Sequence, residues 1–309
     1  MTARPLRLGT RGSPLALAQA RMVQAALAAS EPALAPEGAI EIVVVSTAGD
    51  RVQDRTLAEI GGKGLFTQEI EAGLLAGTLD LAVHSMKDMP TVLPDGLTIE
   101  AVLPRADPRD ALIARGPRSI AELPPAALVG TASLRRAAQL LALRPDLRVV
   151  PLRGNVQTRL RKLAAGEVEA TFLAMAGLER LGLAEVASAA LPPEAMLPAV
   201  AQGAIGIECR TDDAAMLARL ARINHAPTLT AVQAERAFLA VLDGSCRTPI
   251  AALAEIAGAQ CRLRGLVASP DGRRVERVAL EGPAADPVAL GRSAGQELCR
   301  RLPAGFLDP

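Results

Sequence analysis

The order of apolar and polar positions divides the first two-thirds of the chain into alternating strand-like and helix-like stretches. The run at 40–46 (IEIVVVS) is continuous and β-branched, which predicts a buried strand. Apolar residues recur at helical spacing after Ser13-Pro14, a pair typical of a helix start, and again over 66–74. Further strands are predicted at 6–9, 79–84, 97–103, 111–114, 128–130, 147–152, 170–174 and 204–209. This alternation predicts α/β layers built on parallel strands.

A different pattern begins near residue 228 and predicts a separate domain. One helix reaches about Leu242, strands follow at 250–256, 261–268 and 274–280 with a turn at 269–272, and a last helix covers 288–301. We therefore predict three domains: a discontinuous α/β lobe (1–103 and 204–222), a basic α/β lobe (104–203) and a smaller C-terminal α+β domain (226–309). Strand 204–209 is expected to return to the first sheet, so that two crossings join the lobes across a cleft.

Composition argues against several classes of protein. Half of the 309 residues are apolar, 22% are charged and the net charge is +1, which is the balance of a soluble globular protein. No apolar run reaches the roughly 18 residues of a membrane helix. The absence of Trp and Tyr leaves little to stack on bases, which argues against single-strand nucleic-acid binding. Four cysteines without CxxC spacing and only two histidines predict no metal site and a reducing, cytoplasmic compartment.

Positive charge is concentrated between residues 105 and 162. This segment holds eleven Arg and one Lys against four acidic residues, an excess of +8, so that the rest of the chain sums to −7. A near-neutral protein with one basic segment is expected to bind an anion there. A solvated arginine surface explains the charge alone equally well.

Polar residues gather at three junctions where a predicted strand leads into a helix. They are 11–13 (RGS), 131–136 (TASLRR) and 153–155 (RGN), the last followed by Arg159. Helix N-termini offer free backbone N–H groups, and the planar guanidinium group matches a carboxylate. Three such junctions favour a polyanionic ligand over helix capping alone.

Two further stretches hold candidate reactive groups. In 84–88 (HSMKD), Asp88 is a candidate to hold a cation or deliver a proton, and Lys87 to bind an anion or form a Schiff base. A surface Lys-Asp pair without a role is the simpler alternative. Cys246 lies in a glycine-containing loop beside Arg247, which favours the thiolate. Because neither histidine belongs to a supporting motif, Cys246 is interpreted as an attachment point and not as a hydrolytic nucleophile.

Taken in order, these motifs resemble those of the porphobilinogen deaminase family. The matching stretches include RLGTRGSPLALAQA from Arg7, GGKGLF from Gly61, DLAVHSMKDMP from Asp80, DPRDA from Asp107, GTASLRRAAQL from Gly130, LRGNVQTRLRKL from Leu152, LPPEAMLPAVAQGAIGIECR from Leu191 and the Cys246 loop. The resemblance covers nearly the whole chain, and HSMKD and RGNVQTRL are its most specific parts.

The resemblance implies two lobes like those of periplasmic binding proteins and a third domain that carries a cysteine. Cys246 matches the position that holds a dipyrromethane cofactor through a thioether. The implied activity, in tetrapyrrole (porphyrin and heme) biosynthesis, is the head-to-tail condensation of four porphobilinogens with loss of ammonia. Water then releases hydroxymethylbilane.

The resemblance also implies roles for single residues. Asp88 would contact pyrrole N–H groups, help to protonate the departing amine and stabilise the resulting cation. Lys63 and Phe66 would belong to a lid, and Gln202 to a hinge region. The carboxylates of cofactor and substrate would be bound by Arg11, Ser13, Lys87, Thr131, Ser133, Arg135, Arg136, Arg153, Arg159 and Arg180.

The sequence departs from the family pattern at three places. Ala48 stands where the family often has Arg, Ala132 replaces a frequent Ser, and Arg247 follows the cysteine where Gln is common. The first two departures are expected to weaken one ligand contact each without removing the reaction. We expect a monomer that binds the small molecule porphobilinogen and binds neither nucleic acid nor a membrane.

Three alternatives stand beside this interpretation. A non-catalytic binding protein would use the same arginines for an anionic ligand, but it leaves Cys246 and the third domain unexplained. If residues 105–162 bound nucleic acid, the affinity of the protein for DNA would fall as the salt concentration rises. A Schiff-base enzyme using Lys87 would be trapped by borohydride in the presence of substrate.

Overall fold

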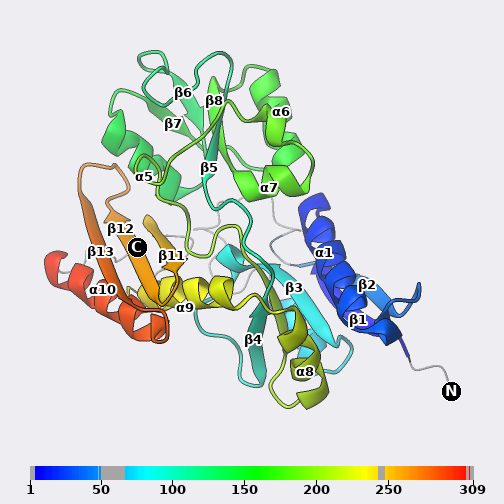
Figure 1. Cartoon of the computed structure of the whole chain (residues 1–309). Helices are drawn as coiled ribbons and strands as arrows, with labels where there is room; N and C mark the ends of the chain where they lie inside the picture. Colours follow the sequence, from blue (N-terminus) through cyan, green and yellow to red (C-terminus); the bar gives the residue numbers. More distant parts are fainter. Residues whose placement is uncertain (1–3, 48, 50–66, 243–247, 304–305, 307–309) are drawn as a thin grey trace. The chain divides into compact units, whose positions relative to one another are not determined.

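The computed structural model describes residues 4–47, 49, 67–242, 248–303 and 306. The chain divides into two compact units, Met1–Arg105 with Ala204–Leu229 and Ala106–Gly203 with Thr230–Pro309. Figure 1 shows the helices and strands of both units.

The first unit is built on a five-stranded mixed sheet in the order β2-β1-β3-β10-β4. Its strands are β1 (Leu6–Arg11), β2 (Ile40–Val45), β3 (Leu81–Ser85), β4 (Leu97–Val102) and β10 (Ile205–Arg210). β1 runs parallel to β2 and β3, whereas β10 is antiparallel to both of its neighbours. The predicted return of 204–209 to this sheet is therefore confirmed. The expectation of parallel strands is wrong for β10, because this strand starts beside the end of β3, with Ile205 opposite Ser85.

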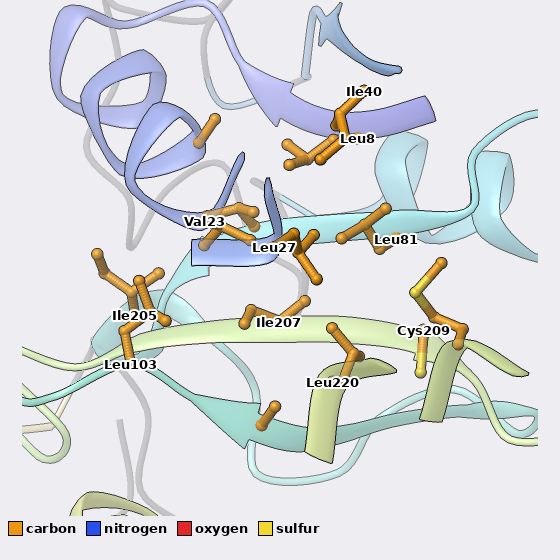
Figure 2. Packing of buried hydrophobic residues seen from close by; sticks show 14 of the residues in the cluster. Leu8, Val23, Leu27, Ile40, Leu81, Leu103, Ile205, Ile207, Cys209 and Leu220 are labelled. Carbon is orange, nitrogen blue, oxygen red and sulfur yellow. The ribbon is translucent and has the colours of Figure 1, made fainter. Parts of the chain in front are cut away.

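Helices cover both faces of this sheet. Helix α1 (Pro14–Ser30) begins as predicted: Ser13 Oγ accepts a hydrogen bond from the Ala16 N–H at 3.2 Å. Helices α1 and α8 (Ala214–Ile223) pack on one face, and Figure 2 shows side chains such as Val23 and Ile207 in the shared core. Helix α4 (Gln68–Leu75) packs Ile70 and Leu74 with Ala82. Because neighbouring strand residues point to opposite faces, Ala82 places α4 on the other side of β3 from Leu81.

The run at 40–46 forms a strand, but it is not buried as predicted. β2 lies at an edge of the sheet and pairs with β1 alone. Val44 is 56% exposed. Continuous apolar runs are typical of central strands, and here the pattern does not distinguish a central strand from an edge strand.

The second unit contains a five-stranded sheet in the order β7-β6-β8-β5-β9. Its strands are β5 (Asp110–Ala114), β6 (Leu128–Gly130), β7 (Arg148–Val150), β8 (Ala170–Ala174) and β9 (Ala189–Ala190). Its helices are α5 (Leu134–Leu143), α6 (Val156–Ala164) and α7 (Met175–Arg180). β6 and β8 have the bounds predicted from the sequence, 128–130 and 170–174. β5 is antiparallel to β8 and β9, so this sheet is mixed as well.

The C-terminal part of the second unit is an antiparallel sheet with helices. Its elements are α9 (Ala226–Val241), which begins in the first unit, and β11 (Ile250–Ala257), β12 (Gln260–Ala268), β13 (Val275–Pro283) and α10 (Pro287–Arg301). The predicted turn closes β12 and β13, and the Gly272 N–H donates to Ser269 O at 2.9 Å. Short 3-10 turns complete the described fold at η1 (Pro32–Leu34), η2 (Met86–Asp88) and η3 (Ala184–Val186).

The predicted fold class is confirmed: mixed α/β sheets are followed by a smaller α+β domain. The second unit contains both the predicted basic lobe and the predicted C-terminal domain, each with its own sheet. The division into three domains and the cleft stay predictions. None of the described helices is long and apolar enough to cross a membrane.

Candidate active site

The first group of candidate residues lines a cavity of about 70 Å³ in the first unit. Arg11 is the last residue of β1, and Ser13 caps α1. Asp88 ends the 3-10 turn η2, which follows β3 directly. Since β1 and β3 are parallel neighbours, their carboxyl ends bring these three side chains to one cavity. Lys87, in the same turn, is half-buried and lies outside the set of residues that line the cavity.

Two further residues of the cavity wall are buried: Gln19, which was not singled out from the sequence, and His84, whose place at a strand end indicated a packed residue. The buried Gln19 donates from Nε2 to Ser85 Oγ at 2.7 Å. His84 Nε2 lies 3.0 Å from Glu208 Oε2, and both side chains are buried. An acidic residue inside the apolar strand 204–209 was the signal that could have identified Glu208.

The second group lies in the second unit, at the start of α5. Ser133 Oγ accepts from the Arg136 N–H at 3.4 Å, and Thr131 Oγ1 accepts from the Ser133 N–H at 3.1 Å. Both hydroxyl groups therefore accept bonds from the backbone. Each keeps its own O–H, which is the donor that a ligand carboxylate needs.

Arg135 and Arg136, in the first turn of α5, share a protein carboxylate that was not predicted from the sequence. Asp110 Oδ2 accepts from Arg135 Nη1 at 2.6 Å, and Asp110 Oδ1 accepts from Arg136 Nη2 at 2.7 Å. Burial alone would raise the pKa of Asp110, but the two guanidinium charges lower it well below its usual range. All three side chains are buried. The structure thus joins these two predicted ligand-binding arginines through an acid.

Arg153, Arg159 and Arg180 are half-buried, and no carboxylate of the described chain forms an ion pair with them. Burial lowers the pKa of Arg159 to about 10, and the charges of Arg136 and Arg153 lower it further. Burial also lowers the pKa of Arg180 to about 10. Within the part of the chain that the structure describes, Arg153 Nη1 and Arg180 Nε are buried without a hydrogen-bond partner. Buried donors of this kind favour an anionic ligand, because one would satisfy the donors and offset the repulsion.

Gln202 is buried and lies just before the second crossing of the chain. Its Nε2 donates to Pro108 O at 2.7 Å and to Asp110 Oδ1 at 2.9 Å. Its role in a hinge stays a prediction. Ala48, Lys63, Phe66, Cys246 and Arg247 lie outside the described residues. Among the residues described, no group of three or more His, Cys, Asp or Glu side chains is placed to hold a metal ion.

Comparisons with known proteins match almost the whole chain. The family model "Porphobilinogen deaminase, dipyromethane cofactor binding domain" matches residues 6–218, and "Porphobilinogen deaminase, C-terminal domain" matches residues 229–300. A porphobilinogen deaminase of Paracoccus denitrificans is 57% identical over 304 residues, which cover 98% of this chain and 96% of the relative. A chloroplastic porphobilinogen deaminase of Oryza sativa is 54% identical over 306 residues, which cover 98% and 86%.

Solved structures give weaker matches. A periplasmic substrate-binding protein of an ABC transporter from Coxiella burnetii has a TM-score of 0.42 at 16% identity, with 72% of this chain and 93% of that chain covered. The VFT2 domain of Bordetella pertussis BvgS has a TM-score of 0.41 at 15% identity, with 72% and 86% covered.

Proposed function

Because the chain belongs to the porphobilinogen deaminase family, we propose that its buried and half-buried arginines bind the carboxylates of substrate and cofactor, while Asp88 transfers the proton and stabilises the charge of the reaction. The protein is a transferase of tetrapyrrole biosynthesis, which condenses four porphobilinogens head to tail and releases hydroxymethylbilane. The observation that carries the assignment of residues is the group of arginines around Arg159, whose charges repel one another and which include the buried, unpartnered donors Arg153 Nη1 and Arg180 Nε of the described chain.

The residues of the second unit suit the dipyrromethane cofactor of this family. A dipyrromethane built from porphobilinogen bears several carboxylates, and the unpartnered Nη1 of Arg153 and Nε of Arg180 are donors that such a group would satisfy. When bound, the cofactor supplies the pyrrole carbon to which the first substrate is joined. We assign its thioether attachment to Cys246, and the binding of its acetate and propionate groups to Arg136, Arg153, Arg159 and Arg180.

We assign the chemical step to the cavity at the ends of β1 and β3. Porphobilinogen loses its amino group when the C–N bond breaks, the nitrogen leaves with an added proton as ammonia, and positive charge develops on the pyrrole that remains. The carboxylate of Asp88 stabilises that charge and, when protonated, donates to the departing nitrogen. Arg11 and Ser13, which line the same cavity, would hold a substrate carboxylate beside it.

Replacing Arg159 with glutamine tests the arginine cluster. We expect the apparent KM for porphobilinogen to rise about 10- to 100-fold, because one charge-assisted hydrogen bond to a carboxylate is lost. We expect no loss of thermal stability, since the variant removes a half-buried cation that Arg136 and Arg153 repel. Steady-state kinetics and a melting curve measure the two effects.

Arg161→Gln is the matched control for this variant. Arg161 lies on the same helix, α6, but is exposed, and its Nη2 lies 3.4 Å from Thr158 Oγ1. It should leave the KM unchanged. Equal KM changes in the two variants would mean that the effect comes from net charge and not from a binding site.

We further propose a cytoplasmic monomer that binds no nucleic acid and no membrane. The described cysteines, Cys209, Cys261 and Cys299, are free thiols, which supports a reducing compartment. The low aromatic content, 1% of residues, supports the absence of a base-stacking surface.

Intact mass of the denatured protein tests the proposed attachment of the cofactor. We expect an added dipyrromethane mass on the peptide that contains Cys246. Because the chain lacks Trp and Tyr, a bound chromophore would also be visible in its absorption spectrum. A chain without the adduct is then incubated with porphobilinogen, which an apoenzyme converts into the adduct with release of ammonia. A non-catalytic binding protein would bind porphobilinogen and release none.

A further inference from the structure

We propose that Asp110 is a positioning residue of this reaction, which fixes the two arginines of α5 against the chain segment that leads to the second crossing. The proposal rests on the function proposed above. Asp110 is the first residue of β5, and its side chain is fully buried. It belongs neither to the cavity that contains Asp88 nor to the residues assigned above to the ligand.

The carboxylate of Asp110 joins three parts of the second unit. Oδ2 accepts from Arg135 Nη1 at 2.6 Å, and Oδ1 accepts from Arg136 Nη2 at 2.7 Å and from Gln202 Nε2 at 2.9 Å. Every polar contact to the carboxylate is a donor. An amide in its place would direct its NH₂ group at one of these donors, so the site requires an ionised acid.

The same contacts tie α5 to the segment before the second crossing. Leu197 O accepts from Arg135 Nη1 at 2.8 Å and from Gln139 Nε2 at 3.0 Å, and the Leu197 N–H donates to Gln139 Oε1 at 2.8 Å. The two chain segments at the crossings also meet directly, since the Ala106 N–H donates to Gly203 O at 3.2 Å. Asp110 therefore fixes the direction of Arg135 and Arg136 relative to both crossing segments.

Arg136 connects this arrangement to the ligand-binding arginines. Its Nη1 donates to Phe172 O at 2.8 Å, and its charge acts on Arg159, whose pKa it lowers. Of the five N–H groups of Arg136, three are used by Asp110 and Phe172. The remaining two can bind a carboxylate only while Asp110 keeps the guanidinium plane in place.

Two possible roles of Asp110 predict opposite changes in the apparent KM for porphobilinogen when its charge is removed. If Asp110 only competed with ligand for the arginines, removing its charge would free them and strengthen substrate binding. If it positions them, removing its charge weakens binding while the chemistry at Asp88 continues. The direction of the change in KM, measured together with kcat, therefore distinguishes a positioning role from a competing one.

The experiment compares Asp110→Asn and Asp110→Glu with the wild-type holoenzyme. The apparent KM for porphobilinogen is expected to rise about tenfold or more in Asp110→Asn and by a smaller factor in Asp110→Glu, which keeps the charge. The kcat, counted per assembled chromophore, should stay within about threefold. If Asp110→Asn does not fold, Asp110→Glu alone tests the proposal. The glutamate keeps the negative charge that pairs with both arginines, but its longer side chain shifts the carboxylate oxygens.

The control is Asp107→Asn, which removes a nearby ion pair that the proposal does not involve. Asp107 Oδ2 accepts from Arg109 Nη2 at 2.6 Å, and in the described part of the chain neither residue forms a hydrogen bond or an ion pair with Asp110. Its KM should equal that of the wild type. A KM that is unchanged or lower in the folded Asp110 variants, or a loss of kcat without a rise in KM, would overturn the proposal. A wild-type protein that does not consume porphobilinogen would instead refute the proposed function, whatever the Asp110 variants do.

Discussion

Asp88→Asn is expected to bind porphobilinogen with nearly normal affinity and to lose about 10²- to 10⁴-fold in kcat. The asparagine has almost the same volume and keeps one carbonyl oxygen for the pyrrole N–H. It carries no negative charge, and it cannot donate a proton to the departing nitrogen. The substitution therefore acts on the transition state much more than on the bound substrate.

Single-turnover release of ammonia from the assembled holoenzyme measures this loss directly. Asp95→Asn is a suitable control, because Asp95 is an exposed acid in the same unit and should leave the rate unchanged. Near-normal turnover by Asp88→Asn would refute the role assigned to this residue. An equal loss in kcat and in substrate affinity would place Asp88 in binding instead of chemistry.

Cys246→Ser is expected to abolish retention of the cofactor. A serine hydroxyl has a pKa far above that of a thiol and is a much weaker nucleophile, so the thioether has no counterpart in the variant. Without the attached primer, we expect turnover to fall to the background of the assay. The purified variant should show the mass of the bare chain after denaturation, with or without prior incubation with porphobilinogen.

Cys299→Ser is the matched control for the cysteine variant. Cys299 lies on α10 and is exposed, so its thiol is also accessible to reagents. We expect this variant to carry the adduct and to turn over normally. An active Cys246→Ser variant with the same adduct would disprove the attachment, and loss of the adduct in Cys299→Ser would move it to α10.

The sequence predicts most elements of the fold because their local signals are strong. β6 and β8 have the predicted bounds, and Ser13 caps α1 as its position before Pro14 indicates. β9 consists of two alanines, Ala189–Ala190, which is too short for any periodicity. The direction of β10 also has no local signal, because the residue pattern of a single strand does not show whether it pairs in parallel or antiparallel unless its connections are known.

Residues of the site could be predicted where a short sequence motif contains them, but contacts between distant motifs could not. The motifs at the ends of β1 and β3 were predicted separately, each from its own strand end, and the structure brings them together because the two strands are parallel neighbours. Asp110 was missed, although it stands within a stretch that was recognised. Its partners follow 25 and 26 residues later along the chain, and sequence alone does not say whether an arginine faces an acid of the protein or an acid of the ligand.

The position of β10 between β3 and β4 determines when the first sheet can be completed during synthesis. The strand that separates β3 from β4 is Ile205–Arg210, which follows all five strands of the β7-β6-β8-β5-β9 sheet along the chain. Until the ribosome has released that segment, the facing edges of β3 and β4 have no partner, and unpaired edges promote aggregation. The sheet of residues 110–190 closes earlier because all its strands are already present. We therefore expect the sheet in the middle of the nascent chain to be complete before the sheet that contains its first hundred residues.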